Sequence, residues 1–545
     1  GIMDNGFSFD MRMSKLDTDG YVDRSHADNY SFYMSGAWRN NKNLVRANII
    51  HGKQLTGLSY YGVVADSLET NRKYNESGEY YDKNGVRRYY EDESSYYLQT
   101  HYHLIYSREI NSHWNLNTAL HYTNGFGYYE QYRYNKKLLT YGYNSSNKTD
   151  LVTRKNMLND FYGISYSLSY SKNKINAVFG GATNQYDGHH YGNVVWMLEA
   201  FDNEVNKEYY RNSGLKNDIS NFLKLDYAVL SNLSIYADIQ HRYITYKMQG
   251  RDDKLLPDNT QKVLDQEHQF NFINPKAGAF YDINDNMNVY ASFAIGNREP
   301  TRTHFKDATG DSNLQPKPEK LYDYELGWRF NNAKFLSAVN LYYMDYIDQI
   351  IPTGEKNSVG YDIMTNAPES YRMGVELSVA WQILKTLSFS ANTTLSRNKI
   401  RNYTQWASFY DESWNETYIS YNLGETDIAL SPSIIGAGVL QWNAFKNFTA
   451  SLTSKYVGEQ YFDNTMSNDR KLDAYFVNNI QFDYLIETKL IKEIGLRFTI
   501  NNIFDVKYSN DAYGGMWFEQ NIEKTWAYYF PQAGINFMGG LSLKF

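Results

Sequence analysis

The sequence predicts an all-β protein, a transmembrane antiparallel β-barrel, from three observations: strict alternation of side chains, unequal connection lengths and an unusual composition. Aromatic residues make up 17% of the 545-residue chain, with 53 Tyr and 10 Trp but only 9 Pro. The mean hydropathy is -0.63, which is too polar for a helical membrane protein. A barrel needs an apolar side chain only at every second position, and its interface girdles are rich in Tyr and Trp.

Alternation is clearest at three places. Phe7, Phe9, Met11 and Met13 are separated by polar or charged residues, and the same holds for residues 322–330 and 387–396. Successive side chains of a strand point to opposite faces. One face is therefore apolar and aromatic, and the other carries charges. Many of these strands run for about 10–18 residues, whereas strands of soluble proteins average about 5–6.

The connections alternate strictly between short turns and long polar loops. The short turns are at Arg39–Asn43, Ile110–His113, Lys172–Lys174, Leu230–Asn232, Asn284–Asn286, Asn331–Lys334, Ile383–Thr386 and Asn443–Asn447, with a looser one at Glu487–Ile494. The largest loops are near residues 55–94, 133–153, 191–214, 252–267, 300–316, 404–430 and 510–533. Short periplasmic turns and long extracellular loops are typical of outer-membrane barrels. We count about twenty strands, the first near residues 6–16 running outward and the last near residues 535–545 running inward.

Composition excludes several function classes. There is no Cys and the net charge is -7, so the chain has neither a thiol nucleophile nor the basic surface of a nucleic-acid-binding protein. No apolar run reaches the roughly 18 residues of a transmembrane helix. Neither a P-loop nor a nucleophile elbow is present, and we expect no enzymatic activity.

The last strand carries a signal of its own. Phe537, Leu541, Leu543 and Phe545 face one way, and the chain ends on that aromatic residue. A terminal Phe on an amphipathic strand resembles the signal read by the outer-membrane assembly machinery. The alternative is an ordinary edge strand that ends in Phe.

The segment LRFTINNIFDVKYSN, residues 496–510, resembles the penultimate strand of TonB-dependent transporters, which often carries an N-N-[IL]-F-D-x-x-Y pattern there. The matching residues are Asn501, Asn502, Ile503, Phe504, Asp505 and Tyr508. Residues 5–24, 186–196, 291–307, 371–381 and 528–545 look like further segments of the family, the first of them like members from Bacteroidota. The resemblance therefore spans the whole chain and implies a receptor of the iron-complex or siderophore type.

That family has a barrel of 22 strands around an N-terminal plug, and such barrels have a plugged lumen. Because we count about twenty strands, we expect residues 1–545 to be the barrel part alone, with Gly1–Asn5 as a periplasmic turn before the third family strand. The plug domain and the first β-hairpin are then absent from this chain. The resemblance also implies the TonB–ExbB–ExbD complex as a partner, reached through the plug.

Three groups of residues are candidates for binding a ligand at the extracellular end. His189 and His190 could offer one imidazole to a metal complex or to haem, but neighbours on a strand face opposite ways and cannot easily share one metal; the alternative is ordinary loop structure. Tyr80 and Tyr81 lie in an acidic loop. Its carboxylates could bind Ca²⁺, and its aromatic faces could stack on a sugar or a catechol. The alternative is that the loop is simply solvated and binds nothing. Arg298 and Arg302 could pair with an anionic ligand, with Glu299 or with the plug.

The expected function is TonB-dependent import of a scarce nutrient complex across the outer membrane of a Gram-negative bacterium, with a ferric siderophore or haem as the best substrate. An importer of cobalamin or an oligosaccharide with the same fold is an alternative. A passive porin or a surface adhesin or scaffold is a second one, although porins usually have 16–18 strands. We expect no resident cofactor apart from a possible loop Ca²⁺. Outer-membrane lipid, lipopolysaccharide and a surface lipoprotein are the other expected partners.

Overall fold

The computed structural model describes residue 3 and residues 5–199, 205–256, 259–308, 315–357, 360–489 and 491–545. Gly1, Ile2 and Asp4 of the predicted first turn lie outside the described residues.

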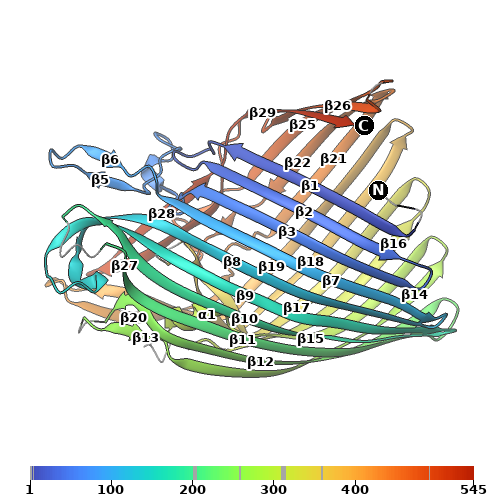
Figure 1. The fold of residues 1–545 in the computed structure, drawn as a ribbon, viewed down its shortest axis with the longest axis horizontal. Helices are drawn as coiled ribbons and strands as arrows, with labels where there is room; N and C mark the ends of the chain where they lie inside the picture. Colours follow the sequence, from blue (N-terminus) through green and yellow to red (C-terminus); the bar gives the residue numbers. More distant parts are fainter. Residues whose placement is uncertain are drawn as a thin grey trace.

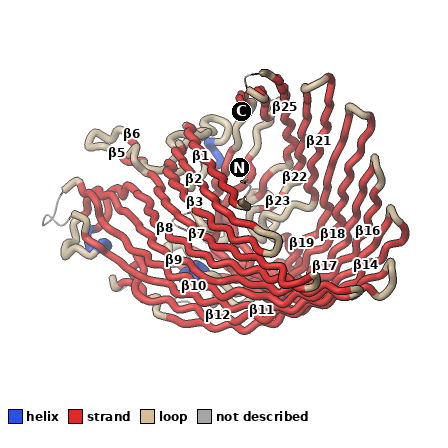
Figure 2. The backbone as a smooth tube through the Cα atoms, turned by 45° about the vertical axis from the view of Figure 1, so that its right-hand side comes forward, coloured by secondary structure: helices blue, strands red, loops and turns tan. Residues whose placement is uncertain are grey.

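Twenty long antiparallel strands form one curved sheet, the wall of the barrel (Figures 1 and 2). This confirms the predicted fold class and strand number. Each wall strand pairs with the next wall strand along the chain, through registers that mostly run without a shift. The wall strands are β1 (Phe7–Thr18), β2 (Ala27–Arg39), β3 (Asn43–Gly57), β7 (Ser94–Asn111), β8 (Trp114–Lys137), β9 (Lys148–Lys172), β10 (Ile175–Met197), β11 (Lys207–Ala228), β12 (Leu233–Leu255), β14 (Gln266–Asn284), β15 (Met287–Arg298), β16 (Glu319–Asn331), β17 (Phe335–Lys356), β18 (Asp362–Leu384), β19 (Leu387–Tyr410), β21 (Ile434–Phe445), β22 (Phe448–Val457), β25 (Tyr475–Glu487), β26 (Glu493–Asn501) and β29 (Asn536–Lys544).

The remaining elements lie in the long connections at one end of the wall. They are β4 (Val63–Val64), η1 (Ala65–Ser67), β5 (Glu79–Tyr81), β6 (Arg87–Tyr89), η2 (Leu138–Tyr141), β13 (Gln261–Val263), α1 (Arg302–Ala308), β20 (Glu416–Asp427), β23 (Gln460–Tyr461), β24 (Lys471–Leu472), β27 (Ser509–Glu519) and β28 (Ile522–Pro531). Within the described part of the chain, no helix has the length and apolar character needed to cross a membrane.

Three of the predicted loops are largely β-structure. In the predicted loop 191–214, β10 continues to Met197 and β11 begins at Lys207. In the predicted loop 404–430, β19 continues to Tyr410 and pairs with β20, and in the predicted loop 510–533, β27 and β28 form a hairpin. Their polar composition suggested loops, but paired strands satisfy their backbone groups as fully as they do inside the wall. β27 also runs parallel to the end of β19.

The eight short turns that lie wholly within the described residues are confirmed, and Asn residues shape several of them. The looser one at Glu487–Ile494 includes residue 490, which lies outside the described residues. The side-chain oxygen of Asn40 accepts hydrogen bonds from the backbone N–H of Lys42 and Asn43, at 2.9 and 2.8 Å. Asn332 caps the turn before β17 in the same way, accepting from Lys334 and Phe335. An Asn side chain that mimics a backbone turn stabilises a tight reversal, which keeps the connections at this end of the wall short.

The two faces of the wall differ as predicted. On β9, Leu158, Tyr162 and Ile164 point outward and are 39%, 43% and 37% exposed, so they present an apolar outer surface. On the lumenal face, Arg242 bridges Asp218 and Glu299, carboxylates that come from different elements. Charges therefore line the lumen, because only there can water and ion pairs satisfy them.

Two edges of the wall stay unpaired with each other. Among the described residues, β1 pairs with β2 and β29 pairs with β26, and no pairing joins β1 to β29. Extracellular segments bridge this seam instead. Val64 of β4 pairs with Tyr528 of β28, and the Tyr513 hydroxyl donates a hydrogen bond to the carbonyl of Tyr61 at 2.8 Å.

The N-N-I-F-D segment ends β26 and holds the start of β29. Asn502 is 3% exposed and has a φ of 50°, in the left-handed region that Asn tolerates better than most residues. Its amide nitrogen donates to the carbonyls of Val506 and Ala533, and its side-chain oxygen accepts from the N–H of Val506. Asp505 accepts from the N–H of Ile535 at 2.8 Å. The role of this segment is therefore structural.

The rest of the segment packs along the same junction. The amide of Asn501 donates to the side-chain oxygen of Asn536 at 2.8 Å, and the ring of Tyr508 packs at a tilt against Tyr475, with 4.3 Å between ring centroids. Phe504 points into the surroundings with 69% of its surface exposed. Phe545 is 76% exposed, and its role as an assembly signal stays a prediction.

We expect Asn502→Ala to lower the free energy of unfolding by about 1–3 kcal/mol, because the buried donors and acceptors that Asn502 satisfies lose their partner. Denaturant titration of the protein in detergent micelles measures this. Asn510→Ala, at an exposed position of the same segment, is the control and should change stability by less than about 0.5 kcal/mol. Equal losses in both variants would contradict the structural role of Asn502.

Candidate functional site

A cluster of cationic and aromatic side chains faces the lumen near its extracellular end. Tyr186 and His190 project from β10, on the face opposite to the lipid-exposed Phe179. Tyr246 projects from β12, on the face opposite to Tyr243. Because alternate residues share a face, all three point into the lumen.

Helix α1 completes the cluster by folding into the lumen. Phe305 is 3% exposed and stacks on His268 of β14 at 3.7 Å between ring centroids, with Tyr246 also in contact. Lys306 makes an ion pair with Asp252 at 3.0 Å. These contacts hold the helix against the inner wall and fix the position of Arg302 in its first turn.

Arg302 presents a cationic donor that no carboxylate of the described residues neutralises. Its guanidinium donates to the side-chain oxygen of Asn212, but its Nε is buried without a hydrogen-bond partner, as is the hydroxyl of Tyr246. A β-carbon built on Gly214 would lie 3.2 Å from both the Tyr246 hydroxyl oxygen and Arg302 Cδ. Glycine at this position therefore lets the two groups converge.

Neighbouring lumenal cations are paired, which sets Arg302 apart. Lys155 pairs with Asp253, and Glu299 accepts from Lys216 at 2.6 Å and from Arg242 at 2.9 Å. Among the described residues, no carboxylate oxygen lies within ion-pair distance of Arg302. His190 and Tyr186 lie within electrostatic range of its guanidinium. The cluster can therefore attract an anion that carries aromatic rings.

A second group of tyrosines surrounds Arg133 on the lumenal face of β8. Arg133 donates to the side-chain oxygen of Gln131, whose amide donates to the Tyr60 hydroxyl. Tyr60 and Tyr61 lie 4.3 Å apart between ring centroids and come from the loop after β3. This group extends the aromatic, cationic lining around the extracellular end of the lumen.

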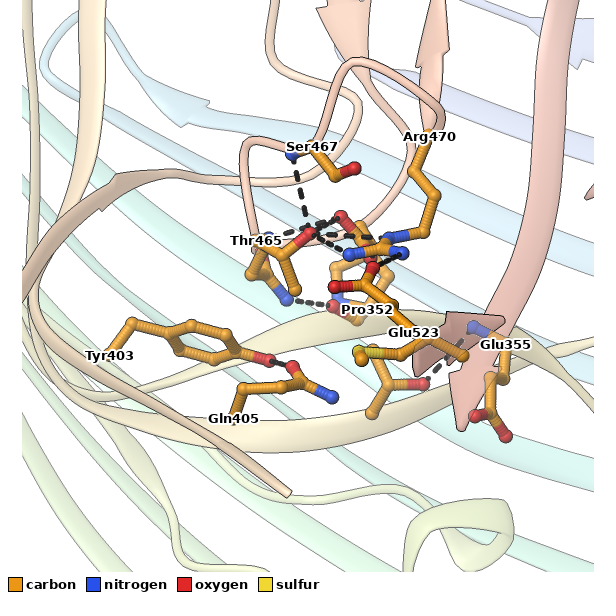
Figure 3. A network of polar contacts seen from close by, with 12 residues as sticks. Pro352, Glu355, Tyr403, Gln405, Thr465, Ser467, Arg470 and Glu523 are labelled. Atoms are coloured by element: carbon orange, nitrogen blue, oxygen red, sulfur yellow. Dashed lines mark hydrogen bonds and ion pairs between the residues drawn. The ribbon is translucent and has the colours of Figure 1, made fainter. Parts of the chain in front are cut away.

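The extracellular segments are locked together around Arg470 (Figure 3). Its guanidinium pairs with Asp463 at 2.6 Å and with Glu523 at 2.8 Å, and it also donates to the Thr465 hydroxyl. Asn464 donates to the carbonyl of Pro352 at the tip of β17. Segments that are distant in sequence therefore form one rigid structure at the outer rim.

Residues 13–503 match the family model described as "TonB dependent receptor-like, beta-barrel". The chain belongs to this family. TonB-dependent receptor barrels lie in the outer membrane of Gram-negative bacteria, so the outward face described above meets lipid and the lumenal face meets water. The family consists of receptors and transporters rather than enzymes.

Curated relatives of this TonB-dependent receptor include the catecholate siderophore receptor Fiu of Escherichia coli (strain K12), 21% identical over 255 residues, and the pesticin receptor of Yersinia enterocolitica, 24% identical over 238 residues. The matches cover 45% and 43% of this chain, and 30% and 32% of those proteins. The chain thus spans about a third of the length of the curated relatives it matches.

Solved structures of similar fold cover nearly all of the chain. The closed form of the ferric-catecholate import receptor Fiu from K12 E. coli has a TM-score of 0.71 at 14% identity, over 99% of this chain and 78% of that one. The unliganded ferric citrate transporter FecA also has a TM-score of 0.71 at 14% identity, over 100% and 74%. These likenesses establish the fold of the TonB-dependent receptor barrel.

The structure separates the predicted histidines. His189 faces outward, with its Nε2 3.5 Å from Asp187, whereas His190 faces the lumen. With the two imidazoles on opposite faces of the strand, they cannot bind one metal ion together. Only His190 joins Arg302, and these two are the predicted site residues that the fold brings together.

The predicted arginines also differ. Arg298 is 54% exposed at its side chain and pairs with Glu319 at 2.9 Å. Neither Arg298 nor Arg302 pairs with Glu299, because Lys216 and Arg242 already bind that carboxylate. Pairing with a plug stays a prediction.

Tyr80 and Tyr81 lie on the outside of the wall. The β5–β6 hairpin that carries Tyr80 packs it against Tyr132 of β8, whose side chain points outward like that of Leu120 on the same strand. Within the described residues, no three acidic or histidine side chains are grouped to hold a metal ion. Calcium binding by this acidic loop therefore stays a prediction.

Sequence reasoning missed Tyr246, Asn212, Gly214 and Arg133. Asn212 and Gly214 lie on β11, and Tyr246 lies on β12. Alternation places all three on the lumenal face, but it does not show which loop residue packs against them. The only sequence signal was the position of Arg302 just beyond a strand that ends at the extracellular side.

Glu93 gives the receptor a pH-dependent contact between the first long loop and the wall. Glu93 is 7% exposed, and its burial raises the pKa of the carboxyl to about 8, although Arg133 and Arg24 act in the opposite direction. Since the pKa in the folded state exceeds the unfolded value of about 4.3, folding favours the neutral acid. Its contribution to stability is complete below about pH 4.3 and is lost as the pH rises through about 8.

We therefore expect loop 58–93 to become more accessible between pH 7 and pH 9, as measured by protease cleavage or amide hydrogen exchange of the purified receptor. Glu93→Gln keeps the neutral form at every pH and should flatten the profile. Glu91→Gln, at an exposed position two residues away, should leave the wild-type profile unchanged. A profile that is the same with and without Glu93 would contradict this assignment.

Proposed function

We propose that this chain forms the wall of a TonB-dependent importer that takes an anionic ferric siderophore across the outer membrane. The observation that carries the proposal is Arg302, which lies beside Tyr246 at the extracellular end of the lumen and has no carboxylate partner within the described part of the chain. The fold is shared with a ferric-catecholate import receptor and a ferric citrate transporter.

The chemistry of ferric chelates matches this cluster. Deprotonated catecholates or carboxylates around Fe³⁺ leave an excess of negative charge, which a guanidinium can neutralise through charge-assisted hydrogen bonds. Catecholate rings can also stack on tyrosines, with a preference for offset or edge-to-face geometry. Tyr186, which is partly exposed, is the tyrosine of the cluster open to this role, whereas Tyr246 is 6% exposed and packs against Phe305.

The proposal also includes two further strands that would close the barrel and a plug that would couple it to TonB. The two unpaired edges, β1 and β29, cannot face lipid without partners, because bilayer interiors leave no water to satisfy free backbone groups. A two-stranded hairpin between these edges would close a barrel of 22 strands. A plug inside the lumen would couple the receptor to TonB–ExbB–ExbD, and ligand binding outside would trigger its rearrangement.

Growth on defined iron sources tests the importer. A strain that lacks the gene should fail on one ferric siderophore and recover when the complete gene is restored, and only if TonB is present. Haem, cobalamin and oligosaccharides are included as the other nutrient arms. Unchanged growth on every iron source would contradict the proposal, and a large steady conductance of the complete protein in a planar bilayer would favour a passive pore.

A further inference from the structure

A cavity of about 1020 Å³ opens on the outer flank of the wall, outside the lumen. The β5–β6 hairpin forms one side of the cavity, and the extracellular ends of β8, β9 and β10 form the other. Its wall residues are Tyr132, Arg154 and Trp196, which lie on the lipid-facing side of their strands, in the same alternation as Leu120 and Leu158. The cavity is therefore distinct from the proposed siderophore site.

Aromatic faces dominate the centre of this flank cavity. Tyr132 stacks on Tyr80 at 4.6 Å between ring centroids, with Tyr90 at 5.7 Å and Trp196 at 6.3 Å. Tyr81, at the edge, is 49% exposed. Tyrosine and tryptophan faces carry negative quadrupole charge, so they attract the slightly positive C–H groups on the flat faces of sugar rings.

Polar groups around these rings are suited to hydroxyl groups rather than to anions. The lining includes five carboxylate side chains and three cationic ones. Arg154 is already bound to Glu130 at 2.7 Å, and Asp150 accepts from the Tyr132 hydroxyl at 2.6 Å. Carboxylates accept hydrogen bonds from sugar hydroxyls and repel phosphates and uronic acids. A large cavity with a few fixed polar groups is the usual form of a small-molecule site.

The height of the cavity above the lipid also favours sugars. On β9, the outward side chains change from apolar at Leu158 to Arg154 and Asp150 towards the extracellular side. The β9 lining of the cavity runs from Arg154 to Lys148, so it begins four residues beyond Leu158, and at about 3.3 Å per residue this is roughly 13 Å along a tilted strand. The cavity thus lies above the hydrocarbon, at the level where an outer leaflet carries its saccharides.

We propose that this flank cavity binds a neutral oligosaccharide. Two sources offer that chemistry, namely the saccharide of the membrane's own glycolipid and a glycan from the surroundings. The tyrosine platform, the excess of carboxylates and the outward position carry the assignment together.

Isothermal titration calorimetry of the complete receptor in detergent tests the proposal. One arm uses uncharged outer-chain oligosaccharides of the host's own lipopolysaccharide, freed of lipid and of the acidic core, and the other uses maltohexaose, cellohexaose, xylohexaose and mannohexaose. Oligogalacturonate is the charged counterpart. Binding in the first arm identifies the membrane as the source, binding in the second identifies an external glycan, and each supports the proposal.

Tyr80→Ala and Tyr132→Ala should weaken binding at least tenfold, whereas Tyr418→Ala, in a different extracellular hairpin and 71% exposed, should leave it unchanged. Heat-modifiable gel mobility verifies that each variant is folded, and Tyr80 on the exposed hairpin provides the test if Tyr132→Ala fails to fold.

The proposal is overturned if no neutral saccharide binds at up to about 10 mM, if oligogalacturonate binds equally well, or if the tyrosine variants bind like the wild type. Uptake of ferric chelates should be unaffected by these variants, so the outcome is independent of the importer proposal.

Discussion

The Arg302→Gln variant is expected to bind a ferric siderophore about ten- to a hundredfold more weakly than the wild-type receptor. A hydrogen bond to a charged group contributes about 1.5–3 kcal/mol, and each 1.4 kcal/mol is about a tenfold change in affinity. Arg302 has no carboxylate partner to release among the described residues, so the loss falls on the ligand rather than on the fold. The Gln side chain can still donate a hydrogen bond to the amide oxygen of Asn212, but it carries no positive charge.

Uptake of radioactive iron by whole cells and ligand binding to the purified receptor measure this effect. Arg298→Gln is the matched control, because Arg298 is more exposed and its charge is already paired with Glu319. We expect the control to alter uptake by less than about threefold, as exposed ion pairs contribute about 0–1 kcal/mol. Equal losses in both variants would show a general effect of charge, and no loss in Arg302→Gln would remove this residue from the ligand site.

The second large effect is expected at Arg470, whose replacement by Ala should lower stability by about 3–5 kcal/mol. Its side chain is 2% exposed and pairs with Asp463, itself 8% exposed. Burial raises the pKa of Asp463 while Arg470 favours the charged carboxylate. Removal of the guanidinium leaves the buried Asp463 without its cation, although the N–H and the hydroxyl of Thr465 still donate to this carboxylate (Figure 3). The extracellular lock should therefore open.

Limited proteolysis of residues 458–474 and thermal unfolding in detergent micelles test this expectation. Arg397→Ala provides the comparison, since Arg397 is 53% exposed in its pair with Glu425, and it should cost no more than about 1 kcal/mol. If Arg470→Ala is as resistant to protease as Arg397→Ala, the lock does not hold the extracellular segments. Arg470→Lys should recover only part of the stability, because an ammonium cannot reproduce the planar contacts of a guanidinium to Asp463 and Glu523.

The wall was predictable because its determinants are local. Alternation around Phe9 or Tyr324 depends only on neighbouring residues, and an Asn such as Asn332 makes its turn from its own side chain. The extent of the strands was less predictable. β19 and β20 continue beyond the membrane because their backbones pair with each other, which polar composition alone does not reveal.

The binding groups were predictable only in part. The sequence by itself determined the apolar and charged faces, the order of the strands, the short turns and the opposite directions of His189 and His190. Tertiary structure alone decided that α1 turns into the lumen to bring Arg302 to Tyr246, and that the β5–β6 hairpin turns outward to place Tyr80 on Tyr132. The physical reason is that a strand's faces follow from a period of two residues, whereas a loop's direction depends on packing against strands that lie far away in sequence.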